Sequence, residues 1–121
     1  MNTKLAFLKE RGVDIDSSLL ILGDEATYNE ILREFFNGFI DQMNAIKAAF
    51  EQKDWKHYTI LVHTLKSNCK TFGFMKLSNM ALEHQTHGET MDVNYINLHI
   101  SEMFVEANNL YKLMDEYFKS I

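Results

Sequence analysis

The chain has 121 residues, of which 46% are hydrophobic and 24% are charged, a balance typical of a single globular domain. This length is too short for a kinase or synthetase with its own nucleotide-binding domain, so we expect residues 1–121 to form one domain. The net charge of −5 disfavours nucleic-acid binding, because that affinity depends on neutralising phosphates.

The sequence also lacks the usual features of secreted and membrane proteins. No 18 apolar residues follow one another, and residues 1–10 carry mixed charges rather than the apolar core of a signal peptide. Cys69 is the only cysteine, so no disulfide can form within the chain. We therefore expect a cytoplasmic protein that does not bind membranes.

Two short helices are predicted at the start of the chain. The whole sequence has five glycines and no proline, which indicates helices joined by short connections. Residues 3–11 are predicted to form a helix that ends at Gly12. Asp16 or Ser17 is then expected to cap a second short helix, which ends at Gly23.

A long helix is predicted to start near Asp24, because apolar side chains recur there in steps of three and four over about six turns. These side chains are Tyr28, Leu32, Phe35, Phe36, Phe39, Met43, Ile46 and Phe50. The polar residues 52–54 predict a turn, and Asp54 is the expected N-cap of the next helix.

Three further helices complete the predicted fold. One covers residues 55–72 and ends at Gly73, and the next covers residues 75–87 and ends at Gly88. The last starts near Asp92, and its predicted buried positions are Ile96, Ile100, Met103, Ala107, Leu110, Met114 and Tyr117. Long amphipathic helices with tight turns predict an all-α fold: an antiparallel up-down-up-down four-helix bundle with a short N-terminal helical cap.

The helix over residues 55–72 has two contrasting faces. At about 100° per residue, one face collects Tyr58, Leu61, Val62, Leu65, Cys69 and Phe72. The opposite face collects Lys56, Thr59, His63, Lys66, Ser67 and Lys70. His63 is therefore predicted to point to solvent. Three lysines on its face, in a protein with excess acid, would attract an anionic group or an acidic partner surface.

An exposed imidazole beside lysines suits phosphoryl transfer. The nucleophile in that chemistry is a neutral ring nitrogen, and nearby positive charge disfavours an imidazolium. Lys66 lies one turn from His63 and can reach phosphoryl oxygens as a point charge. The small side chain of Ser67 leaves room for another protein to close over the site.

The stretch His63–Leu77, HTLKSNCKTFGFMKL, resembles the motif of histidine phosphotransfer (HPt) domains. That motif reads His-x-Leu-Lys-Gly, then a small residue two places on, then Gly and Leu at fixed offsets. Three other segments are also similar to this family: residues 12–16, Gly23-Asp24 and Asp54-Trp55. The resemblance therefore covers nearly the whole chain and implies a single HPt-like domain over residues 1–121.

The resemblance implies that His63 is the phosphoacceptor and that Lys66 steadies the phosphoryl group. The sequence departs from the family at two positions. Ser67 stands where glycine is usual, and Cys69 stands where serine or alanine is usual. Because glycine permits a close backbone approach, Ser67 is expected to restrict or retune partner docking.

Gln85 is the residue predicted to orient His63. His63 lies ten residues before Gly73 and Gln85 lies twelve after it, so the two are at similar height in an antiparallel helix pair. Some members of the family have a glutamine at this offset, which hydrogen-bonds near the active histidine. Partner contacts are expected from Thr59, Ser67, Lys70 and Phe74, with Phe74 as an exposed part of an apolar docking rim.

These residues together predict a phosphocarrier of a two-component phosphorelay, which takes a phosphoryl group from one receiver-domain aspartate and passes it to another receiver. The expected partners are response-regulator receiver domains, with a hybrid histidine kinase as a further candidate. No cofactor of its own is expected, since the receiver would supply Mg²⁺. The chain has no Gly-rich nucleotide loop, so we expect neither autophosphorylation from ATP nor enzymatic turnover. We expect a monomer.

Two alternatives remain open. One is an HPt-like module that binds receivers without carrying phosphate. Ser67, in place of the usual glycine, is the feature that keeps this alternative open. The other is the HPt domain of a larger hybrid or chemotaxis-type histidine kinase. A metal site built from His84, His87, Glu83 and Glu89 is disfavoured, because a closed site needs about four converging ligands. We therefore expect no metal.

Overall fold

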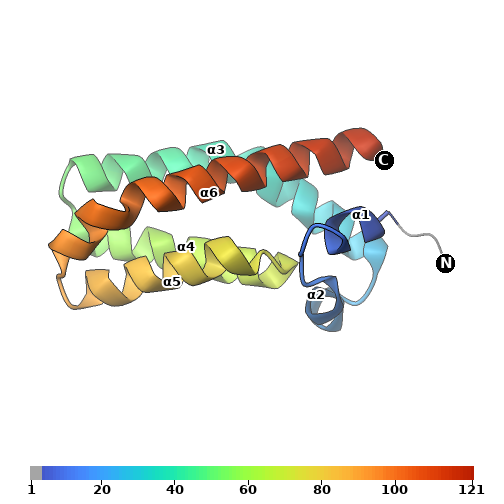
Figure 1. Ribbon diagram of the computed structural model, residues 1–121, viewed down its shortest axis with the longest axis horizontal. Helices are drawn as coiled ribbons and strands as arrows, with labels where there is room; N and C mark the ends of the chain where they lie inside the picture. The colour runs from blue at the N-terminus through green and yellow to red at the C-terminus, as the bar shows by residue number, and fades with distance from the viewer. Residues whose placement is uncertain (1–3) are drawn as a thin grey trace.

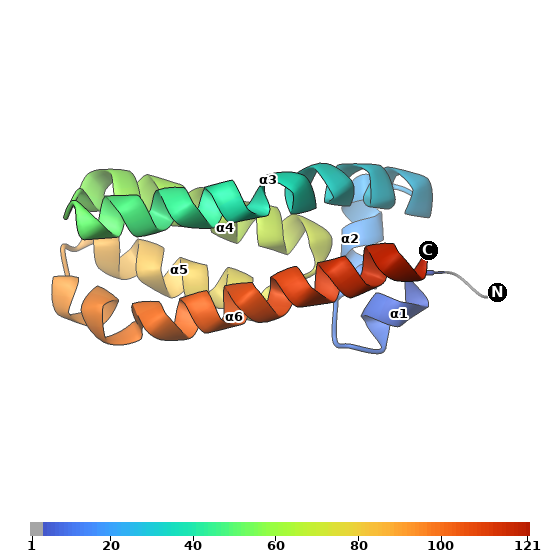
Figure 2. The same cartoon turned by 90° about the horizontal axis from the view of Figure 1, so that it is seen from above.

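The computed structural model describes residues 4–121, and all regular structure in this part of the chain is helical. Four long helices lie along one another and alternate in direction (Figures 1 and 2): α3 (Glu25–Glu51), α4 (Trp55–Phe72), α5 (Met75–Glu89) and α6 (Val93–Ser120). The short helices α1 (Ala6–Lys9) and α2 (Ile15–Leu22) lie at one end of the bundle. The expected all-α bundle with a helical cap is confirmed. Residue 3 of the first predicted helix lies outside the described residues.

Aspartate side chains cap the N-termini of four helices. In each case Oδ1 accepts a hydrogen bond of 2.8–3.2 Å from the backbone N–H three residues later. These aspartates are Asp14, Asp24, Asp54 and Asp92. The expected cap of the second helix, Asp16 or Ser17, was therefore wrong. The helix starts earlier because Ile15 is buried in the core and the Asp14 N–H donates to the Gly73 carbonyl at 3.0 Å.

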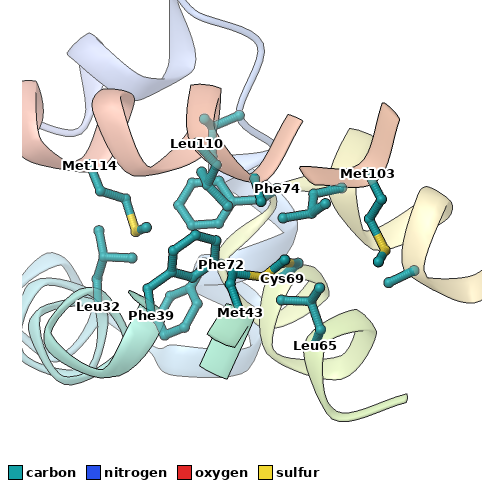
Figure 3. Packing of buried hydrophobic residues seen from close by; sticks show 14 of the residues in the cluster. Leu32, Phe39, Met43, Leu65, Cys69, Phe72, Phe74, Met103, Leu110 and Met114 are labelled. Carbon is teal, nitrogen blue, oxygen red and sulfur yellow. The ribbon is translucent and has the colours of Figure 1, made fainter. Parts of the chain in front are cut away.

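The core is formed where the apolar faces of the helices meet. Figure 3 shows part of it, with Leu32, Phe39 and Met43 of α3, Leu65, Cys69 and Phe72 of α4, and Met103, Leu110 and Met114 of α6. Every predicted inward position of α3, α4 and α6 is buried or half-buried. Cys69 is fully buried, and its burial raises the pKa of the thiol.

Phe74 belongs to this core and does not form an exposed docking rim, so that prediction was wrong. Its side chain is only 5% exposed. Its ring centroid lies 6.1 Å from that of Phe72 and 6.5 Å from that of Phe35. Gly73 ends α4 with a φ of +84°, and the chain then turns back into α5. The aromatic ring at this turn therefore lies among the buried side chains of the core (Figure 3).

Gly88 lies inside α5 and does not end it, because the helix continues to Glu89. The glycine is buried against Thr59 of α4, and an added Cβ would overlap the Thr59 Oγ1 atom. That hydroxyl is held in place, since it donates to the Trp55 carbonyl at 2.7 Å. The glycine therefore serves the close approach of α4 and α5, the two helices with the most extensive interface.

We expect Gly88→Ala to destabilise the bundle by about 1–2 kcal/mol net. The methyl group must displace Thr59 or separate the helices, which outweighs the better helix propensity of alanine. Urea unfolding followed by circular dichroism measures this loss.

Two variants serve as controls for this packing. Gly38→Ala changes an exposed glycine of α3 that has open space around it, and it should leave stability unchanged or raise it by up to about 1 kcal/mol. Thr59→Ala combined with Gly88→Ala should recover most of the lost stability, because the clashing hydroxyl is gone. A Gly88→Ala variant as stable as Gly38→Ala would contradict the close contact.

Candidate functional site

His63 lies on the exposed face of α4, as the helical phase predicted. Its Nδ1 atom lies 3.0 Å from Oε1 of Gln85, which reaches across from α5. The Nζ atom of Lys66, one turn along α4, lies 3.4 Å from the same Nδ1 atom. The structure thus brings together the three side chains that the sequence singled out for chemistry.

The other predicted partner-binding residues on α4 differ in position. Ser67 and Lys70 are exposed on the His63 face. Thr59 is half-buried, and its hydroxyl is directed into the α4–α5 contact with Gly88. The structure therefore gives Thr59 a packing contact, whereas Ser67 and Lys70 remain available to a docking protein.

Gln85 and Lys66 require opposite protonation states of the same ring nitrogen. The Oε1 atom of Gln85 can only accept, so its hydrogen bond needs a proton on Nδ1. The ammonium of Lys66 can only donate, so a hydrogen bond from it needs an unprotonated Nδ1. The Gln85 contact is the shorter of the two, at 3.0 Å against 3.4 Å. It favours the tautomer with its proton on Nδ1 and its lone pair on Nε2.

Glu89 extends this chain of contacts, and this contact was not predicted from the sequence. The Nε2 atom of Gln85 donates to Oε1 of Glu89 at 3.0 Å. The spacing of four residues on one helix face could have indicated the contact. From the sequence, Glu89 was only a disfavoured candidate metal ligand.

Two contacts hold α5 against α4 on either side of Gln85. Before it along the helix, the buried Ser78 hydroxyl donates to the Lys66 backbone carbonyl at 3.0 Å. After it, Gly88 lies against Thr59. The partners of His63 therefore come from a helix whose position is fixed at both ends of the site.

His84 shows how a histidine between the same two helices differs when it is buried. Its side chain is 2% exposed, and its Nδ1 atom lies 2.8 Å from the hydroxyl of Tyr58. Burial disfavours the charged ring and lowers the pKa of His84 to about 4. Burial likewise raises the pKa of the Tyr58 hydroxyl. His84 is thus a neutral hydrogen-bonding member of the core.

The residues considered as metal ligands are directed to other contacts. His87 forms a 2.9 Å contact from its Nδ1 to Asp92 and stacks on Tyr95 with ring centroids 3.6 Å apart. Glu83 lies 3.7 Å from the other ring nitrogen of His87. Across residues 4–121, no three His, Cys, Asp or Glu side chains are grouped so as to hold a metal ion.

A family model of the Hpt domain matches residues 30–110, which is more than half of the chain and includes all of α4 and α5. The chain therefore belongs to the Hpt domain family. Hpt domains are histidine phosphotransfer modules of phosphorelays: they interact with receiver domains and carry phosphoryl groups rather than act as kinases. Neither the comparison with curated proteins nor the comparison with solved structures found a match. No helix between residues 4 and 121 combines the length and apolarity needed to cross a membrane.

The burial of His84 predicts that the protein loses stability as the pH falls from about 6.5 to about 4. In this window the unfolded state binds a proton at residue 84, whereas the folded state, with the lowered pKa, does not. The free energy of unfolding should fall by up to about 3 kcal/mol across the window, at about 1.4 kcal/mol per unit of pKa shift. Urea unfolding at several pH values measures it.

NMR titration of the His84 ring provides the independent check, and the ring should stay neutral until about pH 4. The carboxyl groups of Asp24 and Asp92 do not account for the same loss. Hydrogen bonds from Thr27 to Asp24, and from His87 and Tyr95 to Asp92, lower the pKa of both carboxyl groups from their ordinary value, so their contribution is lost mainly at more acidic pH. Stability that stays constant between pH 6.5 and 4.5 would contradict the buried, neutral His84.

Proposed function

We propose that this Hpt domain is a phosphocarrier and that His63 is its phosphoacceptor. The observation that carries the proposal is the geometry of the ring. His63 is exposed at the motif position, and Gln85 lies 3.0 Å from its Nδ1 atom. A ring held at Nδ1 leaves Nε2 as the nitrogen with a free lone pair. An exposed, oriented nucleophile is what transfer between docked proteins needs.

The whole of residues 1–121 is proposed to act as one such domain. Helices α1 and α2 lie beyond the segment that the family model matches, but several apolar side chains of residues 5–22 are buried in the same core. These side chains include Leu5, Leu8 and Ile15. The N-terminal cap is therefore part of the folding unit that supports α4.

The proposed reaction begins when a receiver domain with a phosphorylated aspartate docks over His63. The lone pair of Nε2 attacks phosphorus in line, the bond from phosphorus to the aspartate oxygen breaks, and the carboxylate leaves with that electron pair. The ring keeps its Nδ1 proton and becomes cationic, and Gln85 accepts a hydrogen bond from it. The reverse reaction passes the phosphoryl group to the aspartate of a second receiver, which restores the neutral ring.

Lys66 is proposed to neutralise the phosphoryl group during transfer. Its ammonium lies 3.4 Å from Nδ1, and it cannot hydrogen-bond that atom while Nδ1 carries a proton. The amine is therefore free to turn toward the anionic oxygens that the docked receiver brings to Nε2. Transfer of this kind depends on positioning and charge stabilisation rather than on covalent machinery in the carrier. The partners proposed are receiver domains of response regulators, with a hybrid histidine kinase as a further source of the phosphoryl group.

His63→Gln should abolish phosphate uptake from a phosphorylated receiver while leaving the fold intact. An exposed side chain contributes little to stability, typically within about 0.5 kcal/mol. The measurements are the acid-labile phosphate gained by the domain, the helical circular dichroism and the melting temperature.

His57→Gln is the matched control, because His57 is another exposed histidine of α4. That variant should accept phosphate as the parent does. Phosphate uptake by His63→Gln would move the site to another residue, with His57 the next candidate. A parent protein that binds receivers but never gains phosphate would show a binding module instead.

Lys66→Ala should slow phosphotransfer by about one to two orders of magnitude, which corresponds to roughly 1.4–2.7 kcal/mol of barrier. Receiver affinity should change much less, because docking depends on a wider surface. Stopped-flow transfer at two ionic strengths measures the effect.

Lys70→Ala is the comparison, since it removes the same charge one turn further along the exposed face. A local phosphoryl contact makes Lys66→Ala much the slower variant, and the difference should depend little on salt. A long-range field would instead slow both variants equally and would weaken at high salt. Equal, salt-sensitive losses would show that Lys66 does not have the proposed role.

A further inference from the structure

We propose that Glu89 sets the tautomer of His63 by fixing the orientation of the Gln85 side-chain amide. Glu89 is then a positioning residue, which acts on the reacting ring without touching it. The inference rests on the proposed function only in that His63 is the phosphoacceptor. It adds a residue that neither the family motif nor the spacing argument had placed at the site.

The contact between Glu89 and Gln85 fixes which end of the Gln85 amide faces which neighbour. A glutamate carboxylate at neutral pH offers only acceptor oxygens. The atom of the Gln85 amide that lies 3.0 Å from Glu89 Oε1 must therefore be the NH₂ nitrogen. Since the amide has one nitrogen and one oxygen, the oxygen is the end that faces His63.

That oxygen acts in turn on the ring of His63. The Gln85 Oε1 atom lies 3.0 Å from His63 Nδ1 and can make a hydrogen bond only if Nδ1 carries the proton. The proton on Nδ1 leaves the lone pair on Nε2, the nitrogen proposed to attack phosphorus. Glu89 thereby selects the reactive form of the ring from one helical turn beyond Gln85.

The other neighbours of the ring do not favour the tautomer with its proton on Nδ1. Without Glu89, the Gln85 amide can rotate and present its NH₂ group to an unprotonated Nδ1. The ammonium of Lys66, 3.4 Å from Nδ1, would support that same tautomer by donating to the bare nitrogen. The Nε2–H tautomer is also the one that free histidine prefers in water. Glu89 is therefore the group that opposes this preference.

The test is the tautomer of His63, read from long-range ¹H–¹⁵N NMR correlations at a pH where the ring is neutral. The parent should carry its proton on Nδ1. Glu89→Lys should convert the ring largely to the Nε2–H form, because an ammonium at residue 89 binds the Gln85 oxygen and turns the NH₂ group toward His63. Glu89→Gln should shift the tautomer less than Glu89→Lys does, because its amide can either accept from Gln85 or donate to it.

Glu83→Lys is the matched control for charge. Glu83 is another exposed glutamate of α5, and its carboxylate lies beside His87 rather than Gln85. This variant makes the same change of charge and should leave the His63 tautomer unaltered. An Nε2–H tautomer in the parent, an unchanged tautomer in Glu89→Lys, or an equal shift in Glu83→Lys would each overturn the proposal.

Phosphotransfer from a receiver supplies the second readout. Glu89→Lys should slow transfer to His63 by about three- to tenfold, and Glu89→Gln should slow it less. The tautomer is measured without any receiver, so the two proposals can fail separately. Normal transfer with an unchanged tautomer in Glu89→Lys would overturn the role of Glu89 alone. A tautomer that responds as expected, in a domain that never gains phosphate, would support Glu89 and overturn the phosphocarrier.

Discussion

Helices α4 and α5 can lie close together beside His63 because residue 88 has no side chain to separate them. A methyl group there would overlap the Thr59 hydroxyl, which its hydrogen bond to the Trp55 carbonyl holds in place. The buried Ser78 hydroxyl binds the backbone carbonyl of Lys66 on the other side of Gln85. The 3.0 Å contact between Gln85 and His63 depends on this spacing, because a small separation of the helices would break it.

The same helix pair holds two histidines whose chemistry is set by burial. His84 lies inside the bundle, where its Nδ1 atom is hydrogen-bonded to the Tyr58 hydroxyl. Desolvation lowers the pKa of its ring to about 4. His63 lies on the solvent side of α4, where a docked protein can reach it. Both rings have a neutral partner from the facing helix at Nδ1, but only the His63 side chain is exposed. Position relative to the core therefore separates a structural histidine from one suited to transfer.

Helical phase was enough to predict the bundle and the exposure of His63, because long amphipathic helices leave little choice about which face is buried. Counting residues from the turn at Gly73 also placed Gln85 beside His63.

The predictions that were wrong or incomplete concern features that depend on tertiary packing. Phe74 was predicted to be exposed, but the turn after Gly73 directs its ring into the core. Gly88 was predicted to end its helix, but it lies inside α5 and permits a close helix contact. Glu89 was missed because its role depends on which end of the Gln85 amide faces it.

The most direct test of this account is to locate the phosphoryl group on the parent protein. The domain would be phosphorylated by a receiver, and ³¹P and ¹H–¹⁵N NMR would identify the residue and the nitrogen that carry phosphorus. The account predicts a single phosphorylated residue, His63, with phosphorus bonded to Nε2 and the proton retained on Nδ1 beside Gln85. Phosphorus on Nδ1 of His63, or on any other residue, would contradict it.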